Sequence, residues 1–71
     1  MAQRTIGQAM KACRKQAGLS TVKVEVLTGI HHNSISNYEN HRYFPSLMTL
    51  LQLADLYGVS LDDLIGREQR I

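Results

Sequence analysis

The chain has 71 residues, a net charge of +2 and one cysteine, Cys13. A chain of this length forms a single domain that buries only about 60% of the surface its unfolded form exposes, so we expect little room for an enclosed active site. One cysteine excludes an intramolecular disulfide, and the sequence has neither the roughly 20-residue apolar run of a membrane span nor the apolar core of a signal peptide, which favours a cytoplasmic protein.

The first predicted element is a helix over residues 4–17. Apolar side chains recur there at i, i+4, i+7 and i+11, the spacing of one helix face. These side chains are Ile6, Met10, Cys13 and Ala17. Gly18 follows at a position where a residue with left-handed backbone angles commonly ends a helix. Cys13 is accordingly interpreted as a small buried side chain of this face.

The second predicted helix covers residues 21–28, with the Ser20 hydroxyl as its N-cap and Gly29 at its end. Its Val-Lys-Val-Glu-Val stretch also alternates like a β-strand. The helix is favoured because no other segment of the chain could pair with an isolated strand.

A third helix is predicted over residues 32–40, after a tight turn that contains Gly29. Its only apolar residues are Ile35 and Tyr38, so a narrow stripe faces the core and the remaining surface is polar. Residues 42–45 are predicted to form a loop, because the residue before Pro45 avoids helical angles.

Two further helices are predicted over residues 46–57 and 61–65, with Ser46 and Ser60 as their N-caps. The core-facing band of the longer helix comprises Leu47, Leu50, Leu51, Ala54 and Tyr57. The predicted fold class is therefore all-α, with five short helices in one domain over residues 1–71.

The outer face of helix 32–40 is the feature that points to a function. Its amides, hydroxyl and imidazole donate and accept hydrogen bonds, which suits the edges of DNA bases. These side chains are His32, Asn33, Ser36, Asn37 and Asn40. Residues 1–45 hold six basic and two acidic side chains (+4), whereas residues 46–71 hold two basic and four acidic ones (−2). We therefore expect a polyanion to bind the N-terminal part.

Several linked motifs resemble one family. Leu19-Ser20, Leu27-Thr28-Gly29-Ile30 and Ser34-Ile35-Ser36-Asn37-Tyr38-Glu39-Asn40 resemble the helix-turn-helix of the phage Cro and repressor type, the XRE family. Residues 45–66, PSLMTLLQLADLYGVSLDDLIG, resemble its fourth and fifth helices, so the similarity covers residues 4–66. The resemblance implies a compact five-helix, lambda-repressor-like fold. It also implies a sequence-specific transcriptional repressor that binds double-stranded DNA as a homodimer.

The resemblance further implies a role for individual residues. Helix 32–40 is the recognition helix, and its base contacts are His32, Asn33, Ser36 and Asn37. The phosphate contacts are Thr21, Asn40, His41, Arg42 and Tyr43. Arg14 and Glu39 match positions that form a buried ion pair, which fixes the angle of the recognition helix. The dimer surface is expected over residues 57–65 and the C-terminal tail.

Four residues depart from the family pattern. Glu25 stands where Ala is usual, so either its side chain turns outward or the angle between the two helices opens. Thr21 is shorter than the usual Gln, and His41 stands where Gly is common, a position that favours a left-handed backbone. His31 replaces a Ser or Thr N-cap, which leaves Asn33 as an alternative cap and would then remove it from base reading.

Three other classes of function are weighed. His31 and His32 fit no standard zinc spacing with Cys13, and they fit none with His41, so no metal site is expected. Ser34 beside the two histidines has neither a pocket nor an orienting carboxylate, so we expect no enzyme, no cofactor and no small-molecule substrate. The remaining alternative is a protein-interaction module on the same fold, an antitoxin or a regulator's partner. The weak net charge and the absence of Lys and Arg from the recognition helix favour it.

Overall fold

The computed structural model describes residues 5–66 of the chain. This part consists of five helices: α1 (Ile6–Gln16), α2 (Thr21–Thr28), α3 (His32–Glu39), α4 (Leu47–Tyr57) and α5 (Leu61–Ile65). The predicted all-α class with five helices is confirmed. None of the helices within residues 5–66 is both long and apolar enough to cross a membrane.

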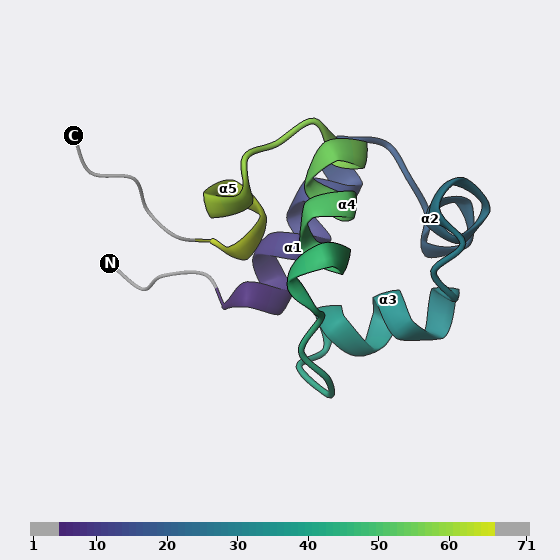
Figure 1. Cartoon of the computed structure of the whole chain (residues 1–71), viewed down its shortest axis with the longest axis horizontal. Helices are drawn as coiled ribbons and strands as arrows, with labels where there is room; N and C mark the ends of the chain where they lie inside the picture. Colours follow the sequence, from purple (N-terminus) through teal and green to yellow (C-terminus); the bar gives the residue numbers. More distant parts are fainter. Residues whose placement is uncertain (1–4, 67–71) are drawn as a thin grey trace.

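The helices surround one core (Figure 1). Helix α1 packs against α5, α3 and α4, and α4 also packs against α5. Helix α2 packs on α3 at the opposite side of the molecule from α5 (Figure 1). The α2–α3 pair is therefore a corner of the domain, and α3 lies along its outer edge (Figure 1).

Serine N-caps and glycine C-caps set most helix ends, as predicted. The hydroxyls of Ser20, Ser46 and Ser60 each accept a hydrogen bond from the backbone N–H three residues later, at 3.0, 3.2 and 3.1 Å. Each bond satisfies one of the amide groups that the first turn of a helix leaves unpaired. Gly29 and Gly58 end α2 and α4 with φ of 79° and 70°.

Helix α1 begins two residues later than predicted. Thr5 has extended backbone angles and is the N-cap: its hydroxyl accepts from Gln8 N at 3.2 Å, and Gln8 Oε1 accepts from Thr5 N at 3.1 Å. This reciprocal capping box fixes Ile6 as the first helical residue. Arg4, the predicted start, lies outside the described residues. Ala17 is the C-cap and is exposed, so the prediction that it belongs to the core is wrong.

The core face of α4 differs from the prediction. Leu50, Ala54 and Tyr57 are buried as expected, and Leu53 is fully buried with them. Leu47 and Leu51 were predicted to face the core, but they are 61% and 42% exposed. The stripe that meets α1 and α5 runs i, i+3, i+4, i+7 from Leu50, and Leu51 lies about 100° around the helix from Leu50.

Candidate nucleic-acid interface

A three-residue turn joins α2 to α3. Gly29 adopts left-handed angles, and its N–H donates to Glu25 O at 2.8 Å. The Thr28 hydroxyl donates to Val24 O at 2.7 Å and accepts from Ile30 N at 3.1 Å. These hydrogen bonds fix the turn, and α3 follows it along the edge of the molecule (Figure 1).

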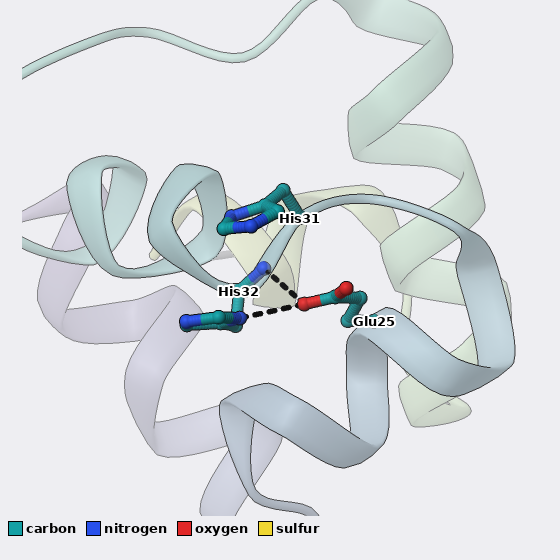
Figure 2. Close-up of side chains that lie close together, drawn as sticks. All are labelled: Glu25, His31 and His32. Carbon is teal, nitrogen blue, oxygen red and sulfur yellow. Dashed lines mark hydrogen bonds and ion pairs between the residues drawn. The ribbon is translucent and has the colours of Figure 1, made fainter.

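His31 and Glu25 organise the N-terminal end of α3. His31 is the N-cap, and its Nδ1 accepts from Asn33 N at 3.1 Å. Asn33 is therefore not the cap, and its side chain is exposed. Glu25 does not turn outward: its Oε1 accepts from His32 N at 2.9 Å and from His32 Nδ1 at 2.6 Å (Figure 2). These two hydrogen bonds, the backbone one foremost, lower the pKa of the Glu25 carboxyl.

A buried ion pair organises the C-terminal end of α3. Arg14 of α1 contacts Glu39 through Nε at 2.8 Å and Nη2 at 3.0 Å, and both side chains are at most 10% exposed. Arg14 Nη1 also donates to Leu19 O at 2.8 Å. The hydrogen bonds to Glu39 raise the pKa of the Arg14 guanidinium above its ordinary value. This bidentate pair links α1 to α3.

Close backbone packing reinforces the same junction. A Cβ atom on Gly7 would lie 2.4 Å from Glu39 O and 2.9 Å from His41 Cε1. Only a residue without a side chain lets α1 approach the end of α3 this closely. His41 has a φ of 63°, the left-handed conformation that its position favours, and its Nε2 lies 2.9 Å from Thr5 Oγ1.

The four residues predicted to contact bases differ in accessibility. Asn33 is exposed, whereas His32, Ser36 and Asn37 are half-buried. Ile35, on the opposite side of α3, is fully buried in the core. The polar side of α3 therefore faces outward while its apolar stripe anchors it.

The residues predicted to contact phosphates lie mainly at the C-terminal end of α3. Asn40 Nδ2 donates to Ser36 O at 2.8 Å, and Arg42 Nη1 lies 3.5 Å from Asn37 Oδ1. Arg42 and Tyr43 are exposed, Tyr43 by 67%. The structure thus groups Asn40 and Arg42 with two of the predicted base contacts. Thr21 is separate from them, half-buried at the start of α2.

The chain matches a family model described as a helix-turn-helix domain over residues 5–65. It belongs to this helix-turn-helix family. The resemblance to the phage Cro and repressor type is confirmed, because the relatives include the immunity repressor protein of Bacillus phage phi105. That protein is 33% identical over 67 residues, which are 94% of this chain and 46% of the phage protein.

A bacterial relative and a solved structure agree. The HTH-type transcriptional regulator ImmR of Bacillus subtilis (strain 168) is 35% identical over 65 residues, 92% of this chain and 51% of ImmR. The P22 c2 repressor, solved in complex with synthetic operator 9T in the presence of Tl⁺, shares the fold with a TM-score of 0.82. It is 23% identical, and the match covers 92% of this chain and 98% of the P22 chain. The chain spans about half the length of the two curated relatives.

One sequence-based interpretation of this helix-turn-helix domain is corrected by the geometry. A carboxylate does orient a histidine here, since Glu25 binds His32 across the turn. The dimer surface over residues 57–65 stays a prediction; Tyr57 and Leu64 are 8% and 0% exposed and belong to the core of their own chain, so the other residues of this range would have to supply it. The C-terminal tail, the rest of that predicted surface, lies beyond the described residues.

Exposed apolar side chains were not predicted at the start of α4. Phe44, Leu47 and Met48 are 68%, 61% and 74% exposed. A leucine-rich helix is interpreted as core-facing from sequence, so only the position of α4 against its neighbours reveals this exposure.

Proposed function

We propose that this helix-turn-helix domain binds double-stranded DNA sequence-specifically, with α3 in the major groove, and acts in the cytoplasm as a transcriptional repressor. The observation that carries the proposal is the two-sided character of α3. Its core side is fully buried at Ile35, and its outer side presents amides and hydroxyls at the edge of the molecule. The phi105 immunity repressor and the ImmR regulator among the relatives, and the operator complex of the P22 repressor, support it.

Base reading is assigned to the outer side of α3. Asn33 and Asn37 can each pair with two atoms of an adenine edge, Ser36 can donate or accept, and His32 stands at the first turn. Asn33, being exposed, reaches a base without rearrangement. Asn37 must exchange its contact with Arg42 for a base.

Phosphate binding is assigned to residues that flank α3. Arg42 carries a permanent positive charge, and the hydroxyl and amide side chains of the set act through hydrogen bonds. The set is Thr21, Asn40, His41, Arg42 and Tyr43. Because Asn40 and His41 bond within the chain, they position the loop that offers Arg42 and Tyr43.

We also propose that the domain acts as a homodimer. One short helix with four base-contacting side chains offers few contacts, whereas two copies on half-sites about 34 Å apart double them. Sedimentation with and without a duplex of two half-sites tests this directly. A single copy per duplex at saturation contradicts it.

The experiment that tests DNA binding begins with selection of a preferred duplex from a random pool. On the selected duplex, Asn37→Ala should cost about 1–3 kcal/mol and relax preference at one or two base pairs. Arg42→Ala should weaken binding to all DNA sequences alike. It should also reduce the slope of log affinity against log salt concentration by about 1. Lys15→Ala is the cationic control, because Lys15 is exposed and is assigned to neither the base contacts nor the phosphate contacts. Equal behaviour of the Asn37 and Arg42 variants refutes the residue assignment.

A protein-interaction module remains the second candidate, and the exposed Phe44, Leu47 and Met48 favour it. The two candidates differ in their response to salt. DNA binding weakens steeply as salt rises, because binding releases counterions from the phosphates and a higher salt concentration reduces the free energy gained by that release. Absence of binding to any duplex, or binding that salt leaves unchanged, supports the protein-interaction module instead.

A further inference from the structure

Glu25, His31 and His32 bring three metal-ligating side chains together where α2 meets α3 (Figure 2). Each offers one oxygen or nitrogen atom, and the three atoms all lie within 4.8 Å of one another. We infer that this cluster binds a divalent transition-metal ion, which ties the two helices of the helix-turn-helix together. The sequence pattern predicted no metal site, because the two histidines fit no standard zinc spacing with Cys13 or His41; Glu25, the third donor, lies across the turn in α2.

The spacing of the donor atoms suits such an ion. Zn²⁺ binds nitrogen and oxygen at about 2.0–2.2 Å, so two donors of a tetrahedral site lie about 3.3 Å apart. Glu25 Oε1 and His32 Nδ1 are 2.6 Å apart, somewhat closer than an ion requires, and the widest separation in the cluster is below 4.8 Å. The side chains of Glu25 and His32 are 37% and 42% exposed, which leaves them room to rotate into position.

The rings of the two histidines are already arranged side by side. They stack with their centroids 4.3 Å apart and their planes at 26° (Figure 2). An imidazole nitrogen binds a metal ion in the plane of its ring, so rings stacked in this way must turn about their side-chain torsions before both can reach one ion. The site therefore needs rotation of side chains, and the backbone of the turn can stay in place.

Protons and lone pairs can be followed through the binding step. His32 Nδ1–H donates a hydrogen bond to the Glu25 carboxylate, and an ion that takes this place requires the neutral ring to carry its one proton on Nε2 instead. His31 Nδ1 uses its lone pair to accept from Asn33 N. A neutral imidazole has one such lone pair. Coordination by His31 therefore exchanges this N-cap hydrogen bond for the metal bond.

The donor set also selects the kind of ion. Two imidazoles and one carboxylate suit Zn²⁺, Co²⁺, Ni²⁺ and Cu²⁺, whereas Mg²⁺ and Ca²⁺ prefer oxygen ligands throughout. A cation at the N-terminus of α3 is disfavoured by the helix dipole, and the negative charge of Glu25 offsets that cost. Three protein ligands leave a fourth position for water.

Titration of the tag-free, DNA-free protein with Co²⁺ and Zn²⁺ tests the inference, separately from any DNA binding. Co²⁺ is followed by its visible absorption and Zn²⁺ by competition with a coloured chelator. We expect one ion per chain. Loss of a supporting residue typically weakens a metal site by about 10- to 100-fold, so loss of a ligand in Glu25→Gln, His31→Asn or His32→Asn should weaken it by at least that much. His31→Asn retains an N-cap residue type, which keeps the start of α3 intact.

The matched control is His41→Asn, since His41 is a histidine outside the cluster and Asn tolerates its left-handed backbone. This variant should bind Co²⁺ and Zn²⁺ like the wild type. On the wild type alone, paramagnetic Co²⁺ should broaden the NMR signals of residues 25, 31 and 32 first, a result that needs no variant to fold. Absence of binding, unchanged binding by Glu25→Gln, or one ion shared by two chains overturns the inference.

Discussion

The two ends of α3 are held in different ways. At its C-terminal end, Arg14 and Glu39 form a bidentate ion pair with side chains at most 10% exposed, and α1 approaches closely at Gly7. At its N-terminal end, Glu25 and His32 are 2.6 Å apart but remain more than one-third exposed. Both ends therefore carry a carboxylate contact, and burial is the difference between them.

That difference has an energetic consequence. Removing one partner of a buried pair leaves a charge without compensation in a low-dielectric environment, whereas water and salt screen an exposed pair. The C-terminal end of α3 is thus fixed to the core. The N-terminal end, where the proposed base-reading face begins, can exchange its contacts with a ligand at small cost.

The largest predicted effect is at the buried end. Glu39→Gln leaves Arg14 buried without its counter-charge, and we expect the free energy of unfolding to fall by about 3–5 kcal/mol. Urea denaturation followed by circular dichroism measures it. The double variant Arg14→Met/Glu39→Leu, which removes both charges, should recover much of the loss. A loss below about 1 kcal/mol would place this pair with ordinary surface ion pairs and remove the contrast between the ends.

The next effect concerns the close approach of α1. Gly7→Ala adds a Cβ that would lie 2.4 Å from Glu39 O, so the helices must separate, and we expect a loss of about 1–3 kcal/mol. This loss opposes the gain of up to about 1 kcal/mol that Ala normally brings to a helix interior. Lys11→Ala, at an exposed position of the same helix, is the control. A stabilised Gly7→Ala variant would show that the junction is not tightly packed.

Sequence reasoning predicted well what is decided locally. Ser20, Ser46 and Ser60 cap their helices because a hydroxyl next to the first turn satisfies its amides wherever the helix lies. The pairing of Arg14 with Glu39 came from family resemblance and not from spacing, since 25 residues separate them. Caps depend on neighbours in the chain, so these three could be predicted without the fold, although the capping box at Thr5 was missed.

The features that the sequence did not reveal depend on how helices are placed. Leucines at positions 47, 50, 51 and 53 define more than one apolar stripe, and only the direction of α1 and α5 selects Leu50 and Leu53 as core. The contact between Glu25 and His32 crosses a turn, where helical periodicity no longer relates the two side chains. Residue types where two helices meet therefore predict few side-chain contacts until the relative position of the helices is known.

A third prediction tests the burial of Tyr57 through the dependence of folding stability on alkaline pH. Burial raises the pKa of Tyr57 well above its ordinary value, with the Glu39 charge as a further cause. Because the folded pKa is raised, the stabilising contribution is complete below the unfolded value of about 10 and is lost as pH rises beyond it, by at most about 1.4 kcal/mol per pH unit. Tyr57→Phe should flatten the fall in stability above pH 10, whereas Tyr43→Phe, at an exposed site, should not. Parallel curves for wild type and Tyr57→Phe would contradict the burial of this hydroxyl.

The smallest effect is expected at the exposed end, from the same chemical change that is largest at the buried one. Glu25→Gln keeps the shape of the side chain and removes its charge, so it should lower stability much less than Glu39→Gln, in metal-free buffer with a chelator present. The difference from wild type should shrink further as salt is added, because salt screens an exposed pair much more than a buried one. Urea denaturation of both variants at low and high salt measures this. Equal losses in the two variants, insensitive to salt, would mean that the start of α3 is held as rigidly as its end, and the N-terminal end would then have no freedom to exchange its contacts for a base or an ion.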